Sequence, residues 1–257
     1  VPAARTVPKC IFIDLGAADG NSFNSFLANS FGPLANCPSG KWEAYLVEAN
    51  PRFVQPLAQL TTKYPADVHV MATTAAFDCE GKTSFYLDTT SVQHNFWGSS
   101  LSSTHPDVQK SGMQHVDVTL VNLNRLLKEK TIPGDWVMVK MDIEGAEWFV
   151  FSANSGAPLK KFKEIIMEFH SIHDESSHPR YLKAMQTIHA AGFKVAHVHG
   201  NNYAGTYRKG GYKIPDVVEI TFVADTPALA TCENPKHNVL DTVNNPNIIE
   251  IPDSVLP

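Results

Sequence analysis

Short apolar runs alternate along the chain with segments in which apolar residues recur every three or four positions. Apolar runs bounded by turn residues are typical of buried strands, and strict alternation of apolar and polar residues is typical of half-buried ones. We therefore predict strands at 10–16, 42–48, 67–77, 82–87, 114–120, 135–142, 163–170, 193–200 and 216–224.

Helical spacing of apolar residues predicts helices between many of these strands. Asn21 or Ser22 is the expected N-cap of the first helix, and Pro51 occupies the first turn of the second. Pro56 lies inside that second helix and is a candidate kink, and Gly192 is expected to end the last helix. The predicted helices span 21–31, 51–64, 122–130, 144–154 and 179–192.

Alternation of strands and helices predicts an α/β fold with a mostly parallel sheet and helices on both faces. No helix pattern separates the last two strands, 193–200 and 216–224, so these strands can form an antiparallel hairpin at the sheet edge. The chain shows no internal repeat and no clear domain boundary. We expect a single domain, 1–257, with its core at about 9–224.

Three segments lie outside this regular pattern. The polar stretch 88–112 has no periodicity, and loops of this length inside a domain are usually functional or disordered. Together with the loop 201–214, it is a candidate lid or substrate loop. The proline-containing segment 225–257 is expected to be a C-terminal tail along the surface.

Composition and charge exclude some classes of function. Hydrophobic residues make up 43% and charged residues 18% of the 257 residues, as in ordinary globular proteins. The net charge is −5 without a cluster of Lys and Arg, which disfavours nucleic-acid binding and a basic membrane-surface patch. No apolar run approaches the ~18 residues of a membrane span. The sequence starts at Val1, so a removed targeting or anchor segment, the compartment and the oligomeric state stay open.

The four cysteines do not define a metal site. Cys10, Cys37, Cys79 and Cys232 have no zinc-like spacing and are too few for a disulfide scaffold in a chain of this length. One or two disulfide bridges are compatible with the sequence.

The segment DLGAADG (14–20) follows a predicted strand and precedes a predicted helix. Gly16 and Gly20 allow a tight turn and a close approach to a ligand, and Ala18 is small enough not to block it. Glu48 ends the next strand, where a carboxylate can accept both ribose hydroxyls of a nucleoside. The glycine spacing is not GxGxxG, which disfavours an NAD-dependent oxidoreductase. The alternative is a turn with small residues for packing alone.

Charged residues end the strand in VKMDIEGAEW (139–148). Lys140 and Asp142 share one face of the strand, and a buried pair of this kind is costly unless it is well hydrogen-bonded. We therefore expect Asp142 to line a functional cleft. Glu144 and Glu147 are expected in the first turn of the following helix, where carboxylates suit the macrodipole, although Glu144 can also continue the cleft face.

The segment MEFH (167–170) ends another strand, and Glu168 and His170 share one face of it. If both strands are central, Asp142 and His170 meet at one rim of the sheet. A histidine beside a carboxylate can act as a general base. A histidine with purely structural hydrogen bonds is the alternative.

Further candidates for substrate contacts lie in and beside the two loops. His199 ends a strand, and the following Asn201 and Asn202 can bind a polar substrate or form a turn. Trp97 can stack on a ring of the substrate or simply pin its loop. A metal ion held by His199, His170 and Asp142 is conceivable, but no close-spaced ligand signature supports it, so no metal ion is predicted.

The ordered segments DLGAADGNSF, LVEANP, TTAAFDCEGKTSFY, VKMDIEGAEW and IIMEFH resemble the FkbM family of S-adenosylmethionine-dependent methyltransferases. The resemblance runs from about Cys10 to about Val223. The most specific signature of the family is KxDxEGxE, which is matched by Lys140, Asp142, Glu144, Gly145 and Glu147.

The resemblance implies a Rossmann-like methyltransferase fold with a seven-stranded sheet whose last strand is antiparallel. It implies S-adenosylmethionine as the cofactor, with Glu48 on the ribose and Ala76 and Phe77 near the adenine. The methionine end would be held by the loop residues Asp14, Gly16, Ala18 and Gly20, and Asp19 of the same loop is counted among the cofactor-binding positions.

By the same resemblance, the expected reaction is O-methylation of a hydroxyl on a sugar, glycan or natural product. The base would be His170 or Asp142, with Lys140 or Glu144 positioning its partner. The expected partner is a small-molecule or glycan acceptor. A non-catalytic binding module on the same sheet, and the disfavoured NAD-dependent oxidoreductase, are the alternatives.

Overall fold

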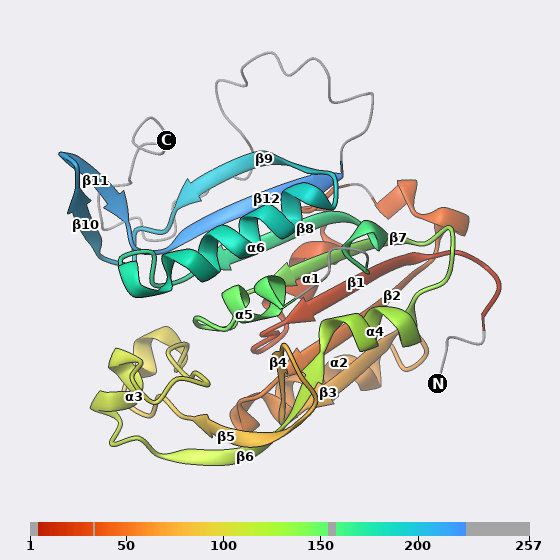
Figure 1. Cartoon of the computed structure of the whole chain (residues 1–257). Coiled ribbons are helices and arrows are strands. Elements are labelled where there is room, and N and C mark those ends of the chain that lie inside the picture. The colour runs from red at the N-terminus through yellow and green to blue at the C-terminus, as the bar shows by residue number, and fades with distance from the viewer. Residues whose placement is uncertain (1–4, 33, 154–157, 225–257) are drawn as a thin grey trace.

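Seven strands form the central sheet, in the order β3-β2-β1-β7-β8-β12-β9 (Figure 1). A computed structural model describes residues 5–32, 34–153 and 158–224, so the predicted tail 225–257 and Cys232 lie outside the described residues. The strands of this sheet are β1 Cys10–Leu15, β2 Trp42–Glu48, β3 Val68–Ala72, β7 Trp136–Met141, β8 Phe162–Phe169, β9 Phe193–Gly200 and β12 Val218–Ala224.

Pairing within the sheet confirms the predicted α/β architecture. The pairs β1–β2, β2–β3, β1–β7 and β7–β8 are parallel. Strand β12 is antiparallel to both β8 and β9 and lies between them, so the predicted hairpin partner β9 forms the edge. Parallel strands place their carboxyl ends at one rim, which is where ligands bind in open α/β sheets.

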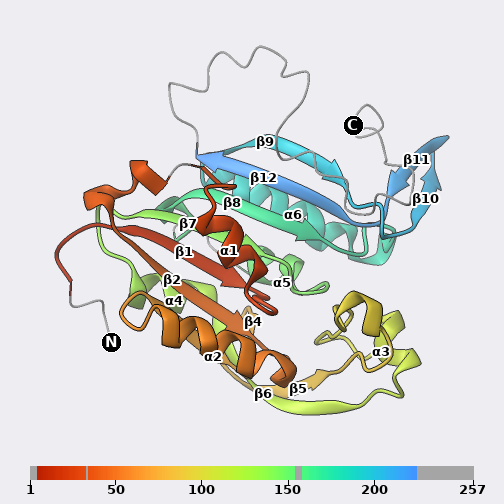
Figure 2. The same cartoon turned by 180° about the vertical axis from the view of Figure 1, so that it is seen from behind.

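Helices cover both faces of the sheet, as Figures 1 and 2 show. Ile11, Ile13 and Leu15 of β1 belong to the buried cluster on the face of α4, α5 and α6. Phe12 belongs to the cluster on the face of α1 and α2, because successive side chains of a strand point to opposite faces. The helices are α1 Asn21–Leu27, α2 Val54–Lys63, α3 Pro106–Lys110, α4 Leu123–Lys130, α5 Glu147–Ser152 and α6 His178–Ala190.

Smaller elements flank the central sheet. A three-stranded sheet has the order β4-β6-β5, and β10 and β11 form a hairpin. These strands are β4 Thr74–Phe77, β5 Gly81–Tyr86, β6 His115–Asn122, β10 Thr206–Lys209 and β11 Tyr212–Pro215. Single 3₁₀ turns span Leu34–Asn36, Pro38–Gly40, Pro51–Phe53, Val92–His94, Pro158–Lys161 and Glu175–Ser177.

Several predicted boundaries are wrong for local reasons. The expected strand 67–77 is two strands, because Thr73 has φ +48° and turns the chain from the central sheet into the three-stranded one. The first helix is capped by Gly20 rather than by Asn21 or Ser22. Pro56 does not kink α2, since it lies in the first turn, where the helix needs no backbone N–H.

The largest shift concerns the helix predicted at 144–154. Helix α5 begins only at Glu147, because Glu144 at φ +54° and Gly145 at φ +99° form a separate turn. Glu144 is therefore not a residue of the first helical turn. Within the described residues, no helix has the length and apolar character required to cross a membrane.

A disulfide joins Cys10 at the start of β1 to Cys37, 27 residues later. This identifies one of the bridges that the sequence left open, whereas Cys79 is exposed and free. The bridge closes the segment that contains α1. A cross-link of this length stabilises a fold mainly by restricting the unfolded chain.

We expect the Cys37→Ser substitution to lower the free energy of unfolding by about 3.5 kcal/mol, from the loop-closure entropy of the bridged segment. Urea unfolding of the oxidised protein measures this change. Cys79→Ser is the matched control and should leave the midpoint unchanged. Equal midpoints for the wild-type protein and the Cys37→Ser variant would contradict the bridge.

Candidate active site

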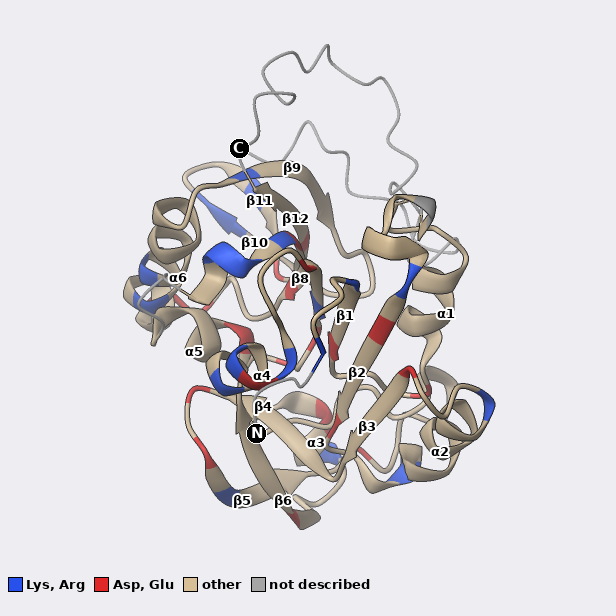
Figure 3. Cartoon of the chain, turned by 90° about the vertical axis from the view of Figure 1, so that its right-hand side faces the viewer, with Lys and Arg blue, Asp and Glu red and all other residues tan. Residues whose placement is uncertain are grey.

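A cavity of about 910 Å³ opens at the carboxyl ends of the central strands. Its walls come from the loop after β1, the ends of β2, β7 and β8, and the loops 91–110 and 201–204. Acidic residues lie on strands of the central sheet, including β2 and β8 (Figure 3), and Glu48 and Glu168 of these strands line the cavity. The site therefore combines the rim position expected for a ligand with several carboxylates.

The loop after β1 is tightly held against its neighbours. The N–H groups of Gly16 and Ala17 donate to the carbonyl of Val47 at 3.0 and 3.1 Å. Gly16 has φ +84°, and a Cβ placed there would lie 1.8 Å from the carbonyl oxygen of Asp142. Only glycine fits this position, because the two backbones approach too closely for a side chain.

Glu48 is connected directly to the same loop. Its Oε2 accepts from the N–H of Ala18 at 2.7 Å, and its Oε1 accepts from the N–H of Asn50 at 2.6 Å. The carboxylate lines the cavity but is 6% exposed, and burial raises its pKa to about 7. Each carboxylate oxygen has two lone pairs, so Glu48 can still accept hydrogen bonds from a ligand.

Asp14 and Lys140 face each other in register on β1 and β7. Asp14 is fully buried, and neither of its oxygens has a hydrogen-bond partner among the described residues. Burial raises its pKa to about 7 against the opposing charge of Lys140. Lys140 Nζ donates to Asp142 Oδ2 at 3.1 Å. Burial alone lowers the pKa of Lys140, but the charges of Asp142 and Asp14 outweigh burial and raise it.

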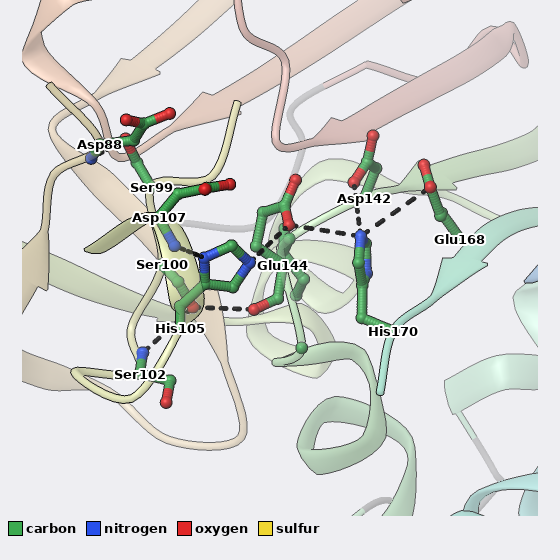
Figure 4. Close-up of polar contacts among 12 residues, drawn as sticks. Asp88, Ser99, Ser100, Ser102, His105, Asp107, Asp142, Glu144, Glu168 and His170 are labelled. Atoms are coloured by element: carbon green, nitrogen blue, oxygen red, sulfur yellow. Dashed lines mark hydrogen bonds and ion pairs between the residues drawn. The ribbon is translucent and has the colours of Figure 1, made fainter. Parts of the chain in front are cut away.

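His170 follows β8 and stands at the centre of a group of carboxylates, as Figure 4 shows. Its Nε2 lies 3.3 Å from Glu144 Oε2, 3.9 Å from Glu168 Oε1 and 4.0 Å from Asp142 Oδ1. All four side chains line the cavity. We refer to Asp142, Glu144, Glu168 and His170 as the acid–histidine cluster.

Glu147 holds the other side of the His170 ring. Its Oε1 lies 3.2 Å from His170 Nδ1 and also accepts from the N–H of Ile143 at 2.8 Å. Its Oε2 accepts from the N–H of Gly145 at 3.0 Å. Glu147 is fully buried and does not line the cavity. Glu147 therefore orients the His170 ring and shapes the turn before α5. The sequence had indicated only a favourable interaction of this carboxylate with the helix dipole.

Burial and charge act in opposite directions within the cluster. Burial alone lowers the pKa of His170, but Glu144 and Glu147 outweigh it and hold the pKa well above its usual range. Burial raises the pKa of Glu168 well above its usual value, and the neighbouring Asp142 adds to that increase. The pKa of Asp142 is lowered overall, because Lys140 and His170 outweigh its burial.

The cavity brings together many of the residues predicted from the sequence but not all of them. Phe77 packs against Phe149 with ring centroids 5.3 Å apart. His199 is 2% exposed and stacks on His197 instead of lining the cavity. The predicted residues that line the cavity are Gly16, Glu48, Ala76, Trp97, Lys140, Asp142, Glu144, His170 and Asn201, and those that do not are Asp14, Ala18, Asp19, Gly20, Phe77, His199 and Asn202.

The predicted loops contribute residues that sequence reasoning did not assign. In the loop 88–112, Ser100 Oγ donates to the Glu144 carbonyl at 2.8 Å, and His105 Nε2 lies 3.5 Å from Glu144 Oε2. Tyr203 meets Trp97 with ring centroids 6.1 Å apart, and both rings are exposed at the cavity. No sequence pattern connects positions so far apart. The aromatic residue in each loop is the one feature of the sequence that could have indicated these substrate contacts.

The sheet order, the glycine loop and the acid at the end of β2 together define a Rossmann-like methyltransferase. The model of the Methyltransferase FkbM domain matches residues 14–195. The chain belongs to this family, is a methyltransferase, and uses S-adenosylmethionine as its cofactor. A search of curated proteins found no match.

A comparison with solved structures found matches over most of the chain at low sequence identity. TYW2 from M. jannaschii in complex with AdoMet is 13% identical, with 86% of this chain and 72% of that chain covered and a TM-score of 0.34. A precorrin 8W decarboxylase from Methanobacterium thermoautotrophicum is 11% identical, with 85% and 83% covered and a TM-score of 0.38.

We expect the ligand-free protein to lose stability between pH 5 and pH 7.5. Asp14 and Glu48 have folded-state pKa values of about 7, above their unfolded values, so the folded state binds more protons in this range. The free energy of unfolding should then fall by roughly 2 kcal/mol for each group as the pH rises. Urea unfolding at both pH values, in the presence of a chelator, measures the difference.

Asp14→Asn and Glu48→Gln should each reduce this pH dependence, because an amide does not titrate. Cys79→Ser is a control that should retain it. A wild-type stability that is flat or rises over the same range would contradict the raised pKa values.

Proposed function

We propose that this methyltransferase transfers the methyl group to a hydroxyl oxygen of a sugar, glycan or related natural product. The observation that carries the proposal is that one cavity contains both Gly16 and Glu48 on one side and the acid–histidine cluster on the other. Its volume of about 910 Å³ is near the upper end of the range for ligand pockets, which leaves room for a second molecule beside the cofactor.

The residues on the β1–β2 side fit S-adenosylmethionine. Glu48 offers a buried carboxylate to the ribose hydroxyls, and Gly16 leaves the backbone accessible. Asp14 and the acid–histidine cluster place negative charge around a cavity that suits a cationic ligand. When bound, this cofactor supplies a methyl group on a positively charged sulfur.

The acceptor hydroxyl has to lose a proton during methyl transfer. We assign the role of proton acceptor to Glu168. Asp142 accepts a hydrogen bond from the charged Lys140. Glu168 instead accepts one from a neutral amide, because Asn201 Nδ2 donates to its Oε1 at 2.6 Å. The sequence assigned the base to His170 or Asp142. These contacts favour Glu168 as the base. His170 is then a positioning residue, because both of its ring nitrogens contact carboxylates of neighbouring residues.

Trp97 and Tyr203 are proposed to contact the acceptor. They are 47% and 42% exposed, line the cavity, and come from the two loops predicted as lids. Aromatic faces with open edges suit the flat apolar face of a sugar ring, and the polar groups of Asn201 and Gln93 line the same cavity. The net charge of −5 disfavours a nucleic-acid acceptor.

Glu48→Gln should weaken S-adenosylmethionine binding by roughly 10- to 100-fold, because hydrogen bonds to a charged acceptor contribute about 1.5–3 kcal/mol. Isothermal titration calorimetry measures the affinity. Glu164→Gln, a change on β8 outside the cavity, is the matched control and should bind normally. NAD should not bind to either protein. Unchanged affinity in the Glu48→Gln variant would remove the assignment of the ribose site.

Glu168→Gln should lower the turnover number by about 10²- to 10⁴-fold, the usual contribution of a general base, while S-adenosylmethionine affinity stays near the wild-type value. Transfer is measured with a labelled methyl donor over a panel of glycans, small phenols and lipids. Trp97→Ala should instead raise the KM for the accepted glycan. Wild-type turnover in the Glu168→Gln variant, or transfer to none of the hydroxyl compounds, counts against the proposal.

A further inference from the structure

We propose that His170 Nε2, Asp142 and Glu144 bind a divalent cation of the Mn²⁺ or Mg²⁺ type, beside which the acceptor hydroxyl is placed. The inference deepens the proposed function, because the ion would act in the same cavity. It also goes beyond the sequence, from which a metal ion was conceivable but not predicted, and it does not use His199.

The geometry around Nε2 is the first argument. Among the described residues, Asp142, His170 and the neighbouring Glu147 offer ligand atoms that all lie within 4.8 Å of one another, although Glu147 faces Nδ1 and not the cavity. Oxygens of Glu144 and Asp142 lie 3.3 and 4.0 Å from Nε2. Ligand bonds of about 2.1 Å place neighbouring ligands of an octahedral ion about 3 Å apart and opposite ones about 4.2 Å apart. Both separations from Nε2 fall within this range, so an ion at Nε2 can reach both carboxylates after movement of their side chains.

The orientation of the imidazole is the second argument. Glu147 contacts Nδ1. Its position is fixed, because its oxygens also accept hydrogen bonds from the N–H groups of Ile143 and Gly145. Nε2 is thereby directed into the cavity. A histidine whose far nitrogen is held by a carboxylate is the usual arrangement at metal sites, because the carboxylate fixes the tautomer and the ring orientation. Glu147 is accordingly a positioning residue and not a ligand.

The balance of charge is the third argument. A single N–H on Nε2 can serve one acceptor, yet three carboxylates surround it at 3.3–4.0 Å. Lys140 is shared between Asp142 and the fully buried Asp14, whose oxygens have no hydrogen-bond partner among the described residues. Two positive side chains therefore stand among a larger number of carboxylates, and this crowding favours retention of protons on Asp14 and Glu168. A divalent cation supplies positive charge and occupies the position of the Nε2 proton.

The chemistry of the ligands selects the ion. Two carboxylates and one imidazole suit a cation that prefers oxygen but tolerates nitrogen, which favours Mn²⁺ over Ca²⁺. An acceptor hydroxyl on such an ion is a stronger acid, and its proton would pass to Glu168, 3.9 Å from Nε2. The oxygen then forms the bond to the methyl carbon while the carbon–sulfur bond breaks and its electron pair stays on sulfur.

Binding of Mn²⁺ tests the inference without any acceptor. The full chain is treated with a chelator, desalted and titrated with MnCl₂, and free Mn²⁺ is followed by its electron paramagnetic resonance signal. We expect uptake of one ion per chain. Asp142→Asn, Glu144→Gln and His170→Ala should each weaken binding by at least about tenfold. Glu164→Gln, on the same strand as Glu168 but outside the cavity, should bind like the wild-type protein.

Two results would overturn the site: no uptake at millimolar Mn²⁺, or equal uptake by the wild-type protein and all three ligand variants. Calorimetry with S-adenosylmethionine in the presence of a chelator verifies that each variant is folded.

The Mn²⁺ titration, taken with the methyl-transfer assay, separates the two proposals. Mn²⁺ uptake without methyl transfer would support the ion while removing the proposed acceptor, and undiminished transfer in the presence of a chelator would remove the ion alone.

Discussion

The buried carboxylate of Glu147 is the contact on which the geometry of the site depends. It accepts two backbone N–H groups from the turn before α5 and contacts His170 at the end of β8. Hydrogen bonds to a charged group contribute about 1.5–3 kcal/mol each, and a buried carboxylate without them would be strongly destabilising. One carboxylate therefore fixes three features: the turn at Glu144, the start of α5 and the direction of the His170 imidazole.

A close backbone contact connects this cluster to the cofactor side of the cavity. Gly16 has no room for a Cβ because the carbonyl oxygen of Asp142 lies where that atom would be. The glycine loop also donates to Glu48 through the N–H of Ala18. The strand ends are thus in direct backbone contact, and the charged side chains project from this closely packed rim. Close packing of the strand ends suits a reaction that depends on alignment.

Much of the fold followed from local patterns. Periodicity located every strand of the central sheet, and a missing helix between β9 and β12 predicted their antiparallel pairing. The boundaries failed where single residues adopt positive φ, as at Thr73 and Glu144, since neither residue type favours that conformation. Tertiary contacts, such as the pairing of Thr74 with β6, override the local preference at these positions.

Sequence by itself indicated the family and the cofactor, through a resemblance carried by five short segments, and the charged residues at the strand ends, because these depend on residue type and local spacing. Only the tertiary structure decided which of those residues meet. It separated Glu147 from the cavity, directed three carboxylates to one nitrogen of His170, and brought Tyr203 against Trp97. The physical reason is that contacts between strand ends and loops depend on sheet order and backbone turns, which no local pattern encodes.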